Sequence, residues 1–169
     1  SAGSDDLFAT VPGVNADGER GTLGIALHPN YPHRPFVYVY ATRTVNGQLR
    51  NQVLRYEDVG GTGEHRRTLL STPASSDPYH NGGHIAFGPD GFLYVGNGAR
   101  TDGGFSDPEG KWAGGGETPI TACLWRLDPK AEKPAIEIYA RGIRNAYGFC
   151  WNDRGEMFAT ENGPNADAP

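Results

Sequence analysis

The amino-acid sequence predicts an all-β fold of repeated hairpins, and three observations support this prediction. The chain of 169 residues contains 25 glycines and 13 prolines, which suits short strands joined by many turns and is too many for a helical bundle. Hydrophobic residues make up 37% and aromatic residues 11% of the chain, so it can bury a core and disorder is not expected. No stretch of useful length has the 3.6-residue apolar period of an amphipathic helix.

Three segments share one pattern and divide the sequence into repeats. Each has a short apolar run, a turn rich in Pro, Asp and Gly, and a second apolar run with aromatic or β-branched residues, which is typical of a hairpin. The segments are LGIALHPNYPHRPFVYVYAT (23–42), HIAFGPDGFLYVGNG (84–98) and YGFCWNDRGEMFATENG (147–163). When Leu27, Phe87 and Trp151 are aligned, the first two lie 60 residues apart and the last two 64, which indicates a repeated supersecondary unit.

Two more strands are expected after each of the first two hairpins. They are NQVLRYEDV (51–59) and HRRTLLST (65–72) in the first repeat, and ACLWRLDP (122–129) and AIEIYARG (135–142) in the second. Four strands in each repeat describe a β-propeller blade with long loops. A jelly roll or another β-sandwich is the alternative, but neither accounts for the repeat.

The repeats predict one partial β-propeller domain over residues 1–169. Its units are roughly 20–78, 79–142 and an incomplete 143–169, which is about two and a half to three four-stranded blades. A closed propeller has about 4–8 blades, because an open ring leaves strand edges unpaired. We therefore expect either a missing C-terminal half or self-association that closes the ring.

Charge and hydropathy exclude two classes of partner. The net charge is −5 and the basic residues are scattered, so no basic face for nucleic acid is expected. No apolar run approaches the roughly 20 residues of a membrane span. The first residues, SAGSDDLFATVPG, lack the basic and apolar regions of a signal peptide, although a mature form whose leader had been removed would look the same.

Cys123 and Cys150 lie in apolar, strand-like stretches. Their spacing fits no metal or redox motif. Buried free thiols are the favoured interpretation, and a disulfide between the two cysteines is the alternative.

Polar residues recur seven positions before the aligned apolar residue of each repeat. These positions hold Arg20, His80 and Arg144. Each lies in the loop that enters the first strand of a unit, and in a propeller such loops surround one mouth of the central channel, where binding sites form. We therefore expect the three side chains to face a common pocket.

His80 is the candidate general base, because only histidine titrates near neutral pH without a perturbed pKa. The alternative is a structural histidine bonded to nearby backbone. His84 is expected to be structural and to point out of the pocket, since it begins the next strand. Arg144 and Asn145 place a cation beside an amide, which suits a carboxylate ligand or a developing oxyanion. The alternative for Arg144 is an ion pair with an acidic residue of the next unit.

Two loops carry many polar residues. The tail from Glu161 to Asp167 (ENGPNAD) is rich in oxygen ligands that suit a hard cation such as Ca²⁺, although it lacks the spacing of an EF-hand loop. The long segment 99–119 is polar and rich in glycine, and we expect it to form a rim or lid.

Taken together, these segments resemble the soluble PQQ-dependent sugar dehydrogenases, the glucose/sorbosone dehydrogenase family. The resemblance rests on six stretches that occur in the family's order and span nearly the whole chain: ERGTLGIALHPNYPHRPFVYVYAT, NQVLRYE, HNGGHIAFGPDGFLYVGNG, LWRLDP, YARGIRNAYGFCW and ATENGPNADAP. It implies a six-bladed propeller that holds pyrroloquinoline quinone (PQQ) and Ca²⁺ over the channel mouth. It also implies oxidation of a sugar or related polyol, reoxidation by an external electron acceptor, and a periplasmic or extracellular location, the leader being absent from this chain.

The resemblance implies a role for each matching residue. His80 matches the family's base and Arg144 the arginine that stabilises charge on the quinone oxygen. Asn145 and Asn162 match cofactor contacts, and Glu19 matches a substrate contact. The backbone carbonyls of Gly163 and Pro164 match ligands of the calcium ion.

The sequence departs from the family at Ala99, where an acidic residue usually orients the histidine base. Asp102, in the following loop, is a candidate replacement. The chain is also about half as long as family members, whose later blades supply further cationic residues. Two other functions therefore stay open: a non-catalytic propeller that binds carbohydrate or protein, and a calcium-dependent hydrolase of the lactonase type, which the basic residues fit poorly.

Overall fold

The computed structural model describes residues 6–75, 78–111 and 115–164, and these residues form strands and loops without a helix. The strands make three antiparallel sheets, two of four strands and one of two. The first sheet contains β1 (Thr22–Leu27), β2 (Phe36–Val45), β3 (Gln48–Val59) and β4 (Thr62–Pro73). The second contains β5 (Ile85–Phe87), β6 (Leu93–Asn97), β7 (Cys123–Leu127) and β8 (Glu137–Arg141), and the third β9 (Ala146–Trp151) and β10 (Met157–Glu161).

The strand pairing confirms the repeat. Within each four-stranded sheet every strand pairs with the next strand in the chain, in the order β1-β2-β3-β4 and β5-β6-β7-β8. The three aligned apolar residues also hold the same place in the pairing, since each is paired with the first or second residue of the following strand. These pairs are Leu27 with Val37, Phe87 with Leu93, and Trp151 with Met157.

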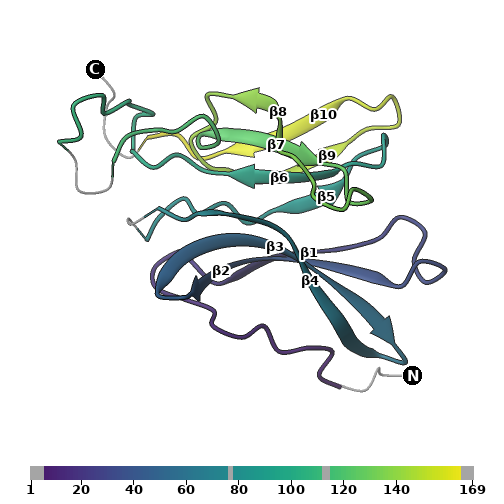
Figure 1. Cartoon of the computed structure of the whole chain (residues 1–169). Coiled ribbons are helices and arrows are strands. Elements are labelled where there is room, and N and C mark those ends of the chain that lie inside the picture. The colour runs from purple at the N-terminus through teal and green to yellow at the C-terminus, as the bar shows by residue number, and fades with distance from the viewer. Residues whose placement is uncertain (1–5, 76–77, 112–114, 165–169) are drawn as a thin grey trace.

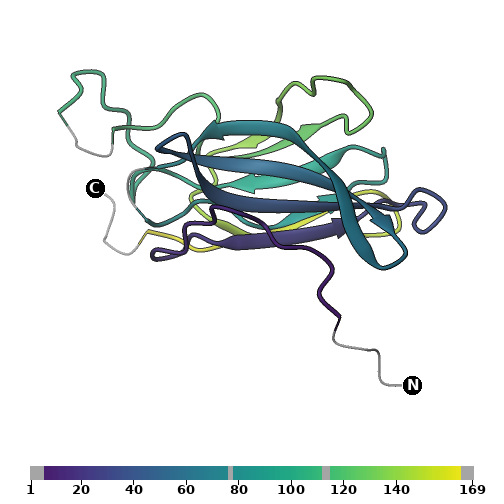
Figure 2. The same ribbon diagram turned by 60° about the horizontal axis from the view of Figure 1, so that its bottom comes forward.

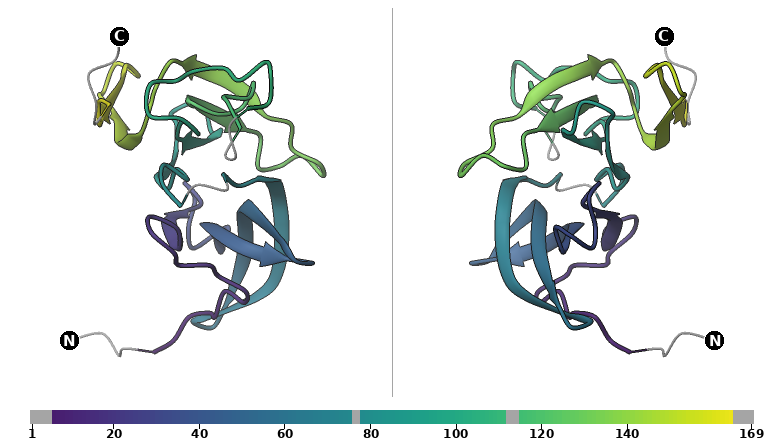
Figure 3. Two further views of the ribbon diagram at one scale, coloured as in Figure 1. Left: turned by 90° about the vertical axis from the view of Figure 1, so that its left-hand side faces the viewer. Right: turned by 90° about the vertical axis from the view of Figure 1, so that its right-hand side faces the viewer.

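The sheets are stacked face to face rather than joined edge to edge (Figures 1 and 3). The largest apolar cluster lies between the first two sheets and includes Tyr38 and Tyr40 of β2 and Trp125 of β7. A second cluster joins the second sheet to the β9–β10 hairpin through Leu124 and Phe149. This stacking of consecutive meander sheets is typical of neighbouring propeller blades.

The N-terminal segment covers the outer face of the first sheet. Phe8, Ala9 and Val11 pack on Val39 and Leu54, and Figure 2 shows this segment crossing in front of the sheet toward the N-terminus. Strand β2 is therefore buried on both faces, which explains its continuous apolar and aromatic sequence.

Glycines allow strands of neighbouring sheets to approach closely. A Cβ atom at Gly24 of β1 would lie 2.0 Å from the carbonyl oxygen of Gly83, just before β5. At Gly96 of β6, an added Cβ would meet the carbonyl oxygen of Ala146 at 3.3 Å. The close contact of the first two sheets thus depends on the absence of a side chain at position 24.

Both cysteines are free, so the disulfide alternative is not realised. Cys123 is buried, and its thiol donates to the carbonyl oxygen of Ile120. Cys150 is exposed on β9, so the prediction that both thiols are buried is wrong for this residue. The alternation of β9 explains the difference, because Phe149 takes the side facing the second sheet. No helix long and apolar enough to cross a membrane occurs among the described residues.

Candidate functional site

The segment HNGG at 80–83 forms an irregular loop that leads into β5. His80 has a φ of 54°, and Gly82 and Gly83 have φ values of 83° and 148°. A left-handed histidine is uncommon and is maintained by contacts elsewhere. The position of His80 therefore depends on what holds this loop.

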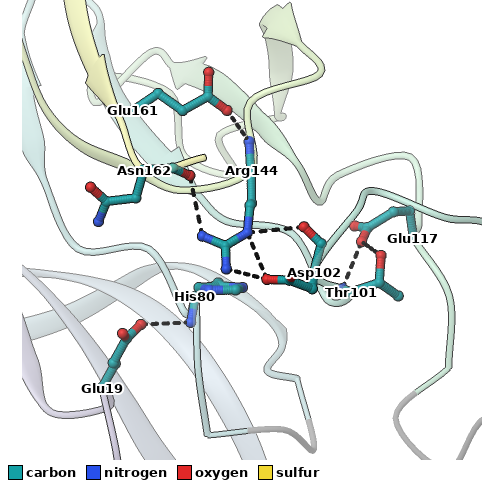
Figure 4. Close-up of polar contacts among 8 residues, drawn as sticks. All are labelled: Glu19, His80, Thr101, Asp102, Glu117, Arg144, Glu161 and Asn162. Atoms are coloured by element: carbon teal, nitrogen blue, oxygen red, sulfur yellow. Dashed lines mark hydrogen bonds and ion pairs between the residues drawn. The ribbon is translucent and has the colours of Figure 1, made fainter. Parts of the chain in front are cut away.

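Two neighbouring segments contact His80 directly. Its backbone N–H donates to a carboxylate oxygen of Glu19 at 2.9 Å (Figure 4). On the other side it packs against Gly98, where an added Cβ would lie 2.4 Å from the His80 carbonyl oxygen and 2.7 Å from its Cβ. The predicted substrate contact Glu19 thus positions the predicted base.

Arg144 lies in the equivalent loop before β9 and is 8% exposed. Its Nε donates to the Asp102 carbonyl oxygen at 2.9 Å and to the Asp102 carboxylate at 3.0 Å, and its Nη2 forms an ion pair with the same carboxylate (Figure 4). The alternative interpretation of Arg144 placed an acidic partner in the next unit, but the partner comes from the preceding one, because the segment after β6 reaches across to β9. The carboxylate considered as a replacement partner for His80 is therefore engaged by Arg144.

One stretch of backbone connects the histidine and arginine loops. Gly98 packs on His80, and the next residue, Ala99, donates its N–H to the Arg144 carbonyl oxygen at 2.6 Å. Ala99 is 1% exposed, so its methyl group fills a closed position between the two loops. The residue that departs from the family pattern is thus central to the site.

The residues after β10 fold back onto Arg144. A Glu161 carboxylate oxygen accepts from the Arg144 N–H at 2.6 Å, and the Asn162 carbonyl oxygen accepts from Arg144 Nη1 at 3.2 Å. Asn162 also donates its N–H to the carbonyl oxygen of Asn145 at 3.2 Å. The predicted cofactor contacts Asn145 and Asn162 are therefore brought together.

Gly163 and Pro164 follow directly and are exposed. A Cβ at Gly163 would meet no described atom within 4 Å, so its backbone borders open space. The rest of the oxygen-rich tail, Asn165 to Asp167, lies outside the described residues. The part of the chain that the structure describes contains no group of three or more His, Cys, Asp or Glu side chains suited to a metal ion.

The loops before β1, β5 and β9 border a cavity of about 450 Å³. Neither His80 nor Arg144 is among its lining residues, so this cavity is not the common pocket that the repeat predicted for these two residues and Arg20. Glu19, Arg20 and Asn145 contribute to its wall. Arg20 is buried and donates from Nη2 to the Ser75 carbonyl oxygen at 2.8 Å. His84 also lines this cavity, so the prediction that it points away is wrong.

His84 nevertheless has the structural contacts that were expected. Its Nε2 lies 3.0 Å from the Phe149 carbonyl oxygen, and its ring packs edge-on against the Phe149 ring at 4.4 Å between centroids. Because Phe149 belongs to β9, this histidine joins the second and third sheets beside the cavity.

A second cavity of about 430 Å³ borders Arg144. Asp102, Glu161 and Pro164 contribute to its wall. Its wall combines the segment after β6 with the end of β10. Arg144 thus borders this second cavity, whereas the next residue, Asn145, lines the first.

Glu117 organises the described part of the 99–119 loop. Its carboxylate accepts from the N–H groups of Arg100 and Thr101 at 3.1 and 2.8 Å and from the Thr101 hydroxyl at 2.8 Å. These bonds close the loop at its base and bring Asp102 to Arg144. The sequence analysis did not single out Glu117 or the role of Glu161, since both depend on contacts between distant segments.

Comparisons with known proteins identify the family of the chain. The family model described as Glucose / Sorbosone dehydrogenase matches residues 2–167. The chain belongs to this family. Its membership confirms the resemblance that was inferred from the sequence.

Several relatives have known structures or functions. The chain is 25% identical to quinoprotein glucose dehydrogenase B of Acinetobacter calcoaceticus, over 98% of this chain and 41% of the relative. It superposes with a TM-score of 0.72 and 36% identity on an oxidoreductase (glucose dehydrogenase) of Thermus thermophilus, covering 93% of this chain and 49% of that one. The PQQ-bound aldose sugar dehydrogenase of Streptomyces coelicolor gives a TM-score of 0.67 and 33% identity, with coverages of 91% and 46%.

The chain thus spans about half the length of these relatives. A shorter match, 33% identical over 49% of this chain and 13% of the relative, is to human Hedgehog-interacting protein. The all-β fold of antiparallel sheets is shared with the dehydrogenases, whereas the number of blades in a closed ring stays a prediction.

Proposed function

We propose that this glucose/sorbosone dehydrogenase family member takes part in the PQQ- and Ca²⁺-dependent oxidation of a sugar or related polyol. The observation that carries the proposal is the convergence of the His80 and Arg144 loops on the Gly98–Ala99 backbone at the cavity end of the molecule. Oxidation of an alcohol to a carbonyl compound removes a hydride from carbon and a proton from the hydroxyl. Bound PQQ supplies the hydride acceptor, which no side chain can provide.

His80 is the proposed base for the hydroxyl proton. Its left-handed backbone and its contacts with Glu19 and Gly98 fix the position of the His80 backbone, from which the imidazole extends. Proton transfer in a bound complex requires a base that is held in position. Glu19 lines the cavity beside it and is the proposed substrate contact. In this arrangement Glu19 both orients the base and borders the space for the sugar.

Arg144 has the donors that an anionic quinone needs. A guanidinium carries five N–H groups. Among the described residues, the bonds to Asp102 and Asn162 engage the N–H of Nε, which is shared between two Asp102 oxygens, and one N–H each of Nη1 and Nη2. One N–H on each terminal nitrogen is thus left for a ligand. Together with the amides of Asn145 and Asn162, this donor set fits a planar molecule with carboxylates and carbonyl oxygens.

The carbonyl oxygens of Gly163 and Pro164 are the proposed protein ligands of Ca²⁺. Backbone carbonyls are ligands that this hard cation accepts, and both residues are exposed at the end of the segment that carries Asn162. The second cavity, which Pro164 lines, adjoins them. A cation here would lie next to the proposed quinone contacts, where it would stabilise added negative charge.

A closed ring is the proposed setting for this site. The chain covers 46–49% of two structurally related enzymes, so we propose that a six-bladed propeller is completed by further chain or by association of copies. The units of this chain would then be roughly 20–78, 79–142 and an incomplete 143–169. We propose a periplasmic or extracellular location.

Reconstitution tests the function. The protein is incubated with PQQ and Ca²⁺, and reduction of an artificial electron acceptor by aldoses is followed, with PQQ binding measured separately. We expect sugar-dependent reduction that His80→Gln lowers by about 100-fold or more. His33→Gln, an exposed histidine in the turn before β2, is the matched control and should keep full activity. PQQ binding without reduction by any aldose would contradict the enzymatic proposal.

Binding without catalysis is the second candidate. Two observations favour it: Ala99 leaves the histidine without the acid that family members use, and a stretch of the chain matches Hedgehog-interacting protein. A carbohydrate- or protein-binding propeller would retain the fold and lack PQQ affinity. The PQQ-binding measurement therefore separates the two candidates, and the absence of PQQ binding favours this second one.

A further inference from the structure

We propose that Tyr40 is a positioning residue for the base His80, acting from the preceding sheet through the backbone of Asn81. This inference rests on the proposed function for its catalytic meaning, but the structural coupling can be measured without it. The hydroxyl of Tyr40 donates to the Asn81 carbonyl oxygen at 2.7 Å, and Asn81 directly follows His80.

Tyr40 is placed rigidly. It lies in the middle of β2, is 1% exposed and belongs to the apolar cluster between the first two sheets. Its hydroxyl therefore emerges from a packed core, where a phenol requires a hydrogen-bond partner. Burial raises the pKa of Tyr40, so the group stays a neutral donor over the whole physiological range.

The loop that receives this bond cannot hold itself in place. The residues His80, Gly82 and Gly83 all have positive φ, and this segment precedes the first ladder pair of the second sheet, Ile85 with Val95. Glycine gives the backbone many alternative conformations, and a histidine with positive φ is in a sparsely populated one. External anchors must therefore select the observed one.

Asn81 is the loop residue that the first sheet contacts by hydrogen bonds. It is 2% exposed, its side chain donates to the Tyr79 carbonyl oxygen at 3.1 Å, and its amide oxygen lies 3.4 Å from Nδ2 of Asn51. Asn51 in turn accepts from the hydroxyl of Thr42 at 2.8 Å. A buried polar network from β2 and β3 thus ends at the residue after the base, and partly satisfied networks of this kind are costly.

Tyr40 supplies the shortest of the bonds from the first sheet to Asn81. Glu19 binds the N–H of His80, in the peptide group before that residue, and Tyr40 binds the carbonyl group of Asn81, one peptide group beyond it, so the two contacts flank the His80–Asn81 segment. The base His80 therefore belongs to the loop that leads into the second sheet, but residues of the first unit position it. Loss of the Tyr40 hydroxyl would leave a buried carbonyl oxygen with a weakened set of partners and release the loop on one side.

Tyr40→Phe tests this role against a matched control. Tyr56 is 3% exposed on the neighbouring strand β3, and its hydroxyl is buried without a hydrogen-bond partner among the described residues. Tyr56→Phe thus removes the same atom from the same sheet without touching the loop. Both variants keep the ring that packs in the core.

The first measurement is hydrogen exchange of the backbone amides at 80–83 in the full chain without cofactor. We expect Tyr40→Phe to speed this exchange by about tenfold or more relative to the parent, while Tyr56→Phe stays within about twofold. Equal exchange in the two variants would overturn the proposal, whether or not the protein oxidises sugars.

The second measurement uses the protein reconstituted with PQQ and Ca²⁺. A displaced base lowers the rate of the chemical step and leaves sugar binding intact, so we expect kcat to fall by about tenfold with KM for the sugar within about twofold. If Tyr40→Phe speeds loop exchange but the parent protein shows no sugar oxidation, the result would count against the proposed function and leave the positioning role standing. Faster exchange with an unchanged kcat in an active enzyme would remove the catalytic role.

Discussion

Arg144 and Asp102 are 42 residues apart in the chain, yet the guanidinium of one donates to both the carbonyl oxygen and the carboxylate of the other. Asp102 belongs to the segment after β6, whereas Arg144 precedes β9. This pair therefore fixes the arginine of the third hairpin to the loop of the second sheet, and its removal should affect both stability and function.

Asp102→Ala is expected to lower the free energy of unfolding by about 1–2 kcal/mol. Hydrogen bonds to charged groups contribute about 1.5–3 kcal/mol, and the estimate is reduced because the Asp102 side chain is 40% exposed. Urea unfolding measures the change. Glu109→Ala breaks an ion pair with Lys111 in which both side chains are highly exposed, so it should change stability by less than about 0.5 kcal/mol. Equal effects of the two substitutions would show that Asp102 does not anchor Arg144.

The two thiols should differ sharply in reactivity. Burial raises the pKa of Cys123 to about 11, so at pH 8 this thiol stays protonated and enclosed, whereas Cys150 is exposed. An aromatic disulfide reagent at pH 8 should therefore modify one thiol per native chain and two after unfolding in denaturant. Cys150→Ser should abolish the native reaction. A native chain without any reactive thiol would contradict the exposure of Cys150.

The sequence predicted the repeat and the loops of the site because both depend on local patterns. Alternating apolar runs with Pro-Asp-Gly turns specify hairpins directly, and equal spacing to Leu27, Phe87 and Trp151 identified Arg20, His80 and Arg144 as related loop positions. The partners of these residues could not be predicted in the same way. Asp102 reaches Arg144 across a long loop, and no local pattern determines where such a loop ends.

The hydrogen-bond partner of Tyr40, a core residue, could not be predicted from the sequence either. Its place in VYVYAT predicts a buried strand residue, and a buried phenol predicts a partner for the hydroxyl. Only the packing of the first two sheets identifies that partner as the carbonyl oxygen of Asn81. His84 was predicted to point out of the cavity because it starts a strand, but the ladder begins one residue later, and its side chain turns toward β9 instead.

Gly24→Ala should destabilise the chain by about 1–3 kcal/mol, because the new methyl group would lie 2.0 Å from the Gly83 carbonyl oxygen. Gly148 lies at the same position of the repeat, three residues before its aligned apolar residue, and a Cβ there would contact only the Thr160 hydroxyl oxygen at 3.8 Å among the described atoms. Gly148→Ala should therefore be neutral or slightly stabilising, since alanine restricts the unfolded chain more than glycine does. Chemical unfolding of both variants measures the difference. Similar free energies of unfolding for the two variants would show that the packing of the first two sheets does not require glycine at position 24.

Ala99→Asp tests whether the departure from the family limits catalysis. The Ala99 methyl group is buried, its N–H donates to the Arg144 carbonyl oxygen, and the preceding Gly98 packs on His80. A carboxylate at this position would lie beside the histidine loop and could accept a bond from the imidazole, which orients a base and stabilises its protonated form.

We expect Ala99→Asp to raise kcat for sugar oxidation about tenfold in the reconstituted protein, with the pKa seen in the kcat profile moving upward because the carboxylate favours the imidazolium. Ala99→Asn is the matched control, since it has nearly the same shape and no charge, and it should leave that pKa in place. Stability must be measured alongside, because a buried carboxylate without a partner would unfold the chain instead. If the variant stays folded and binds PQQ but gains neither rate nor a shifted profile, His80 is not limited by the missing acid.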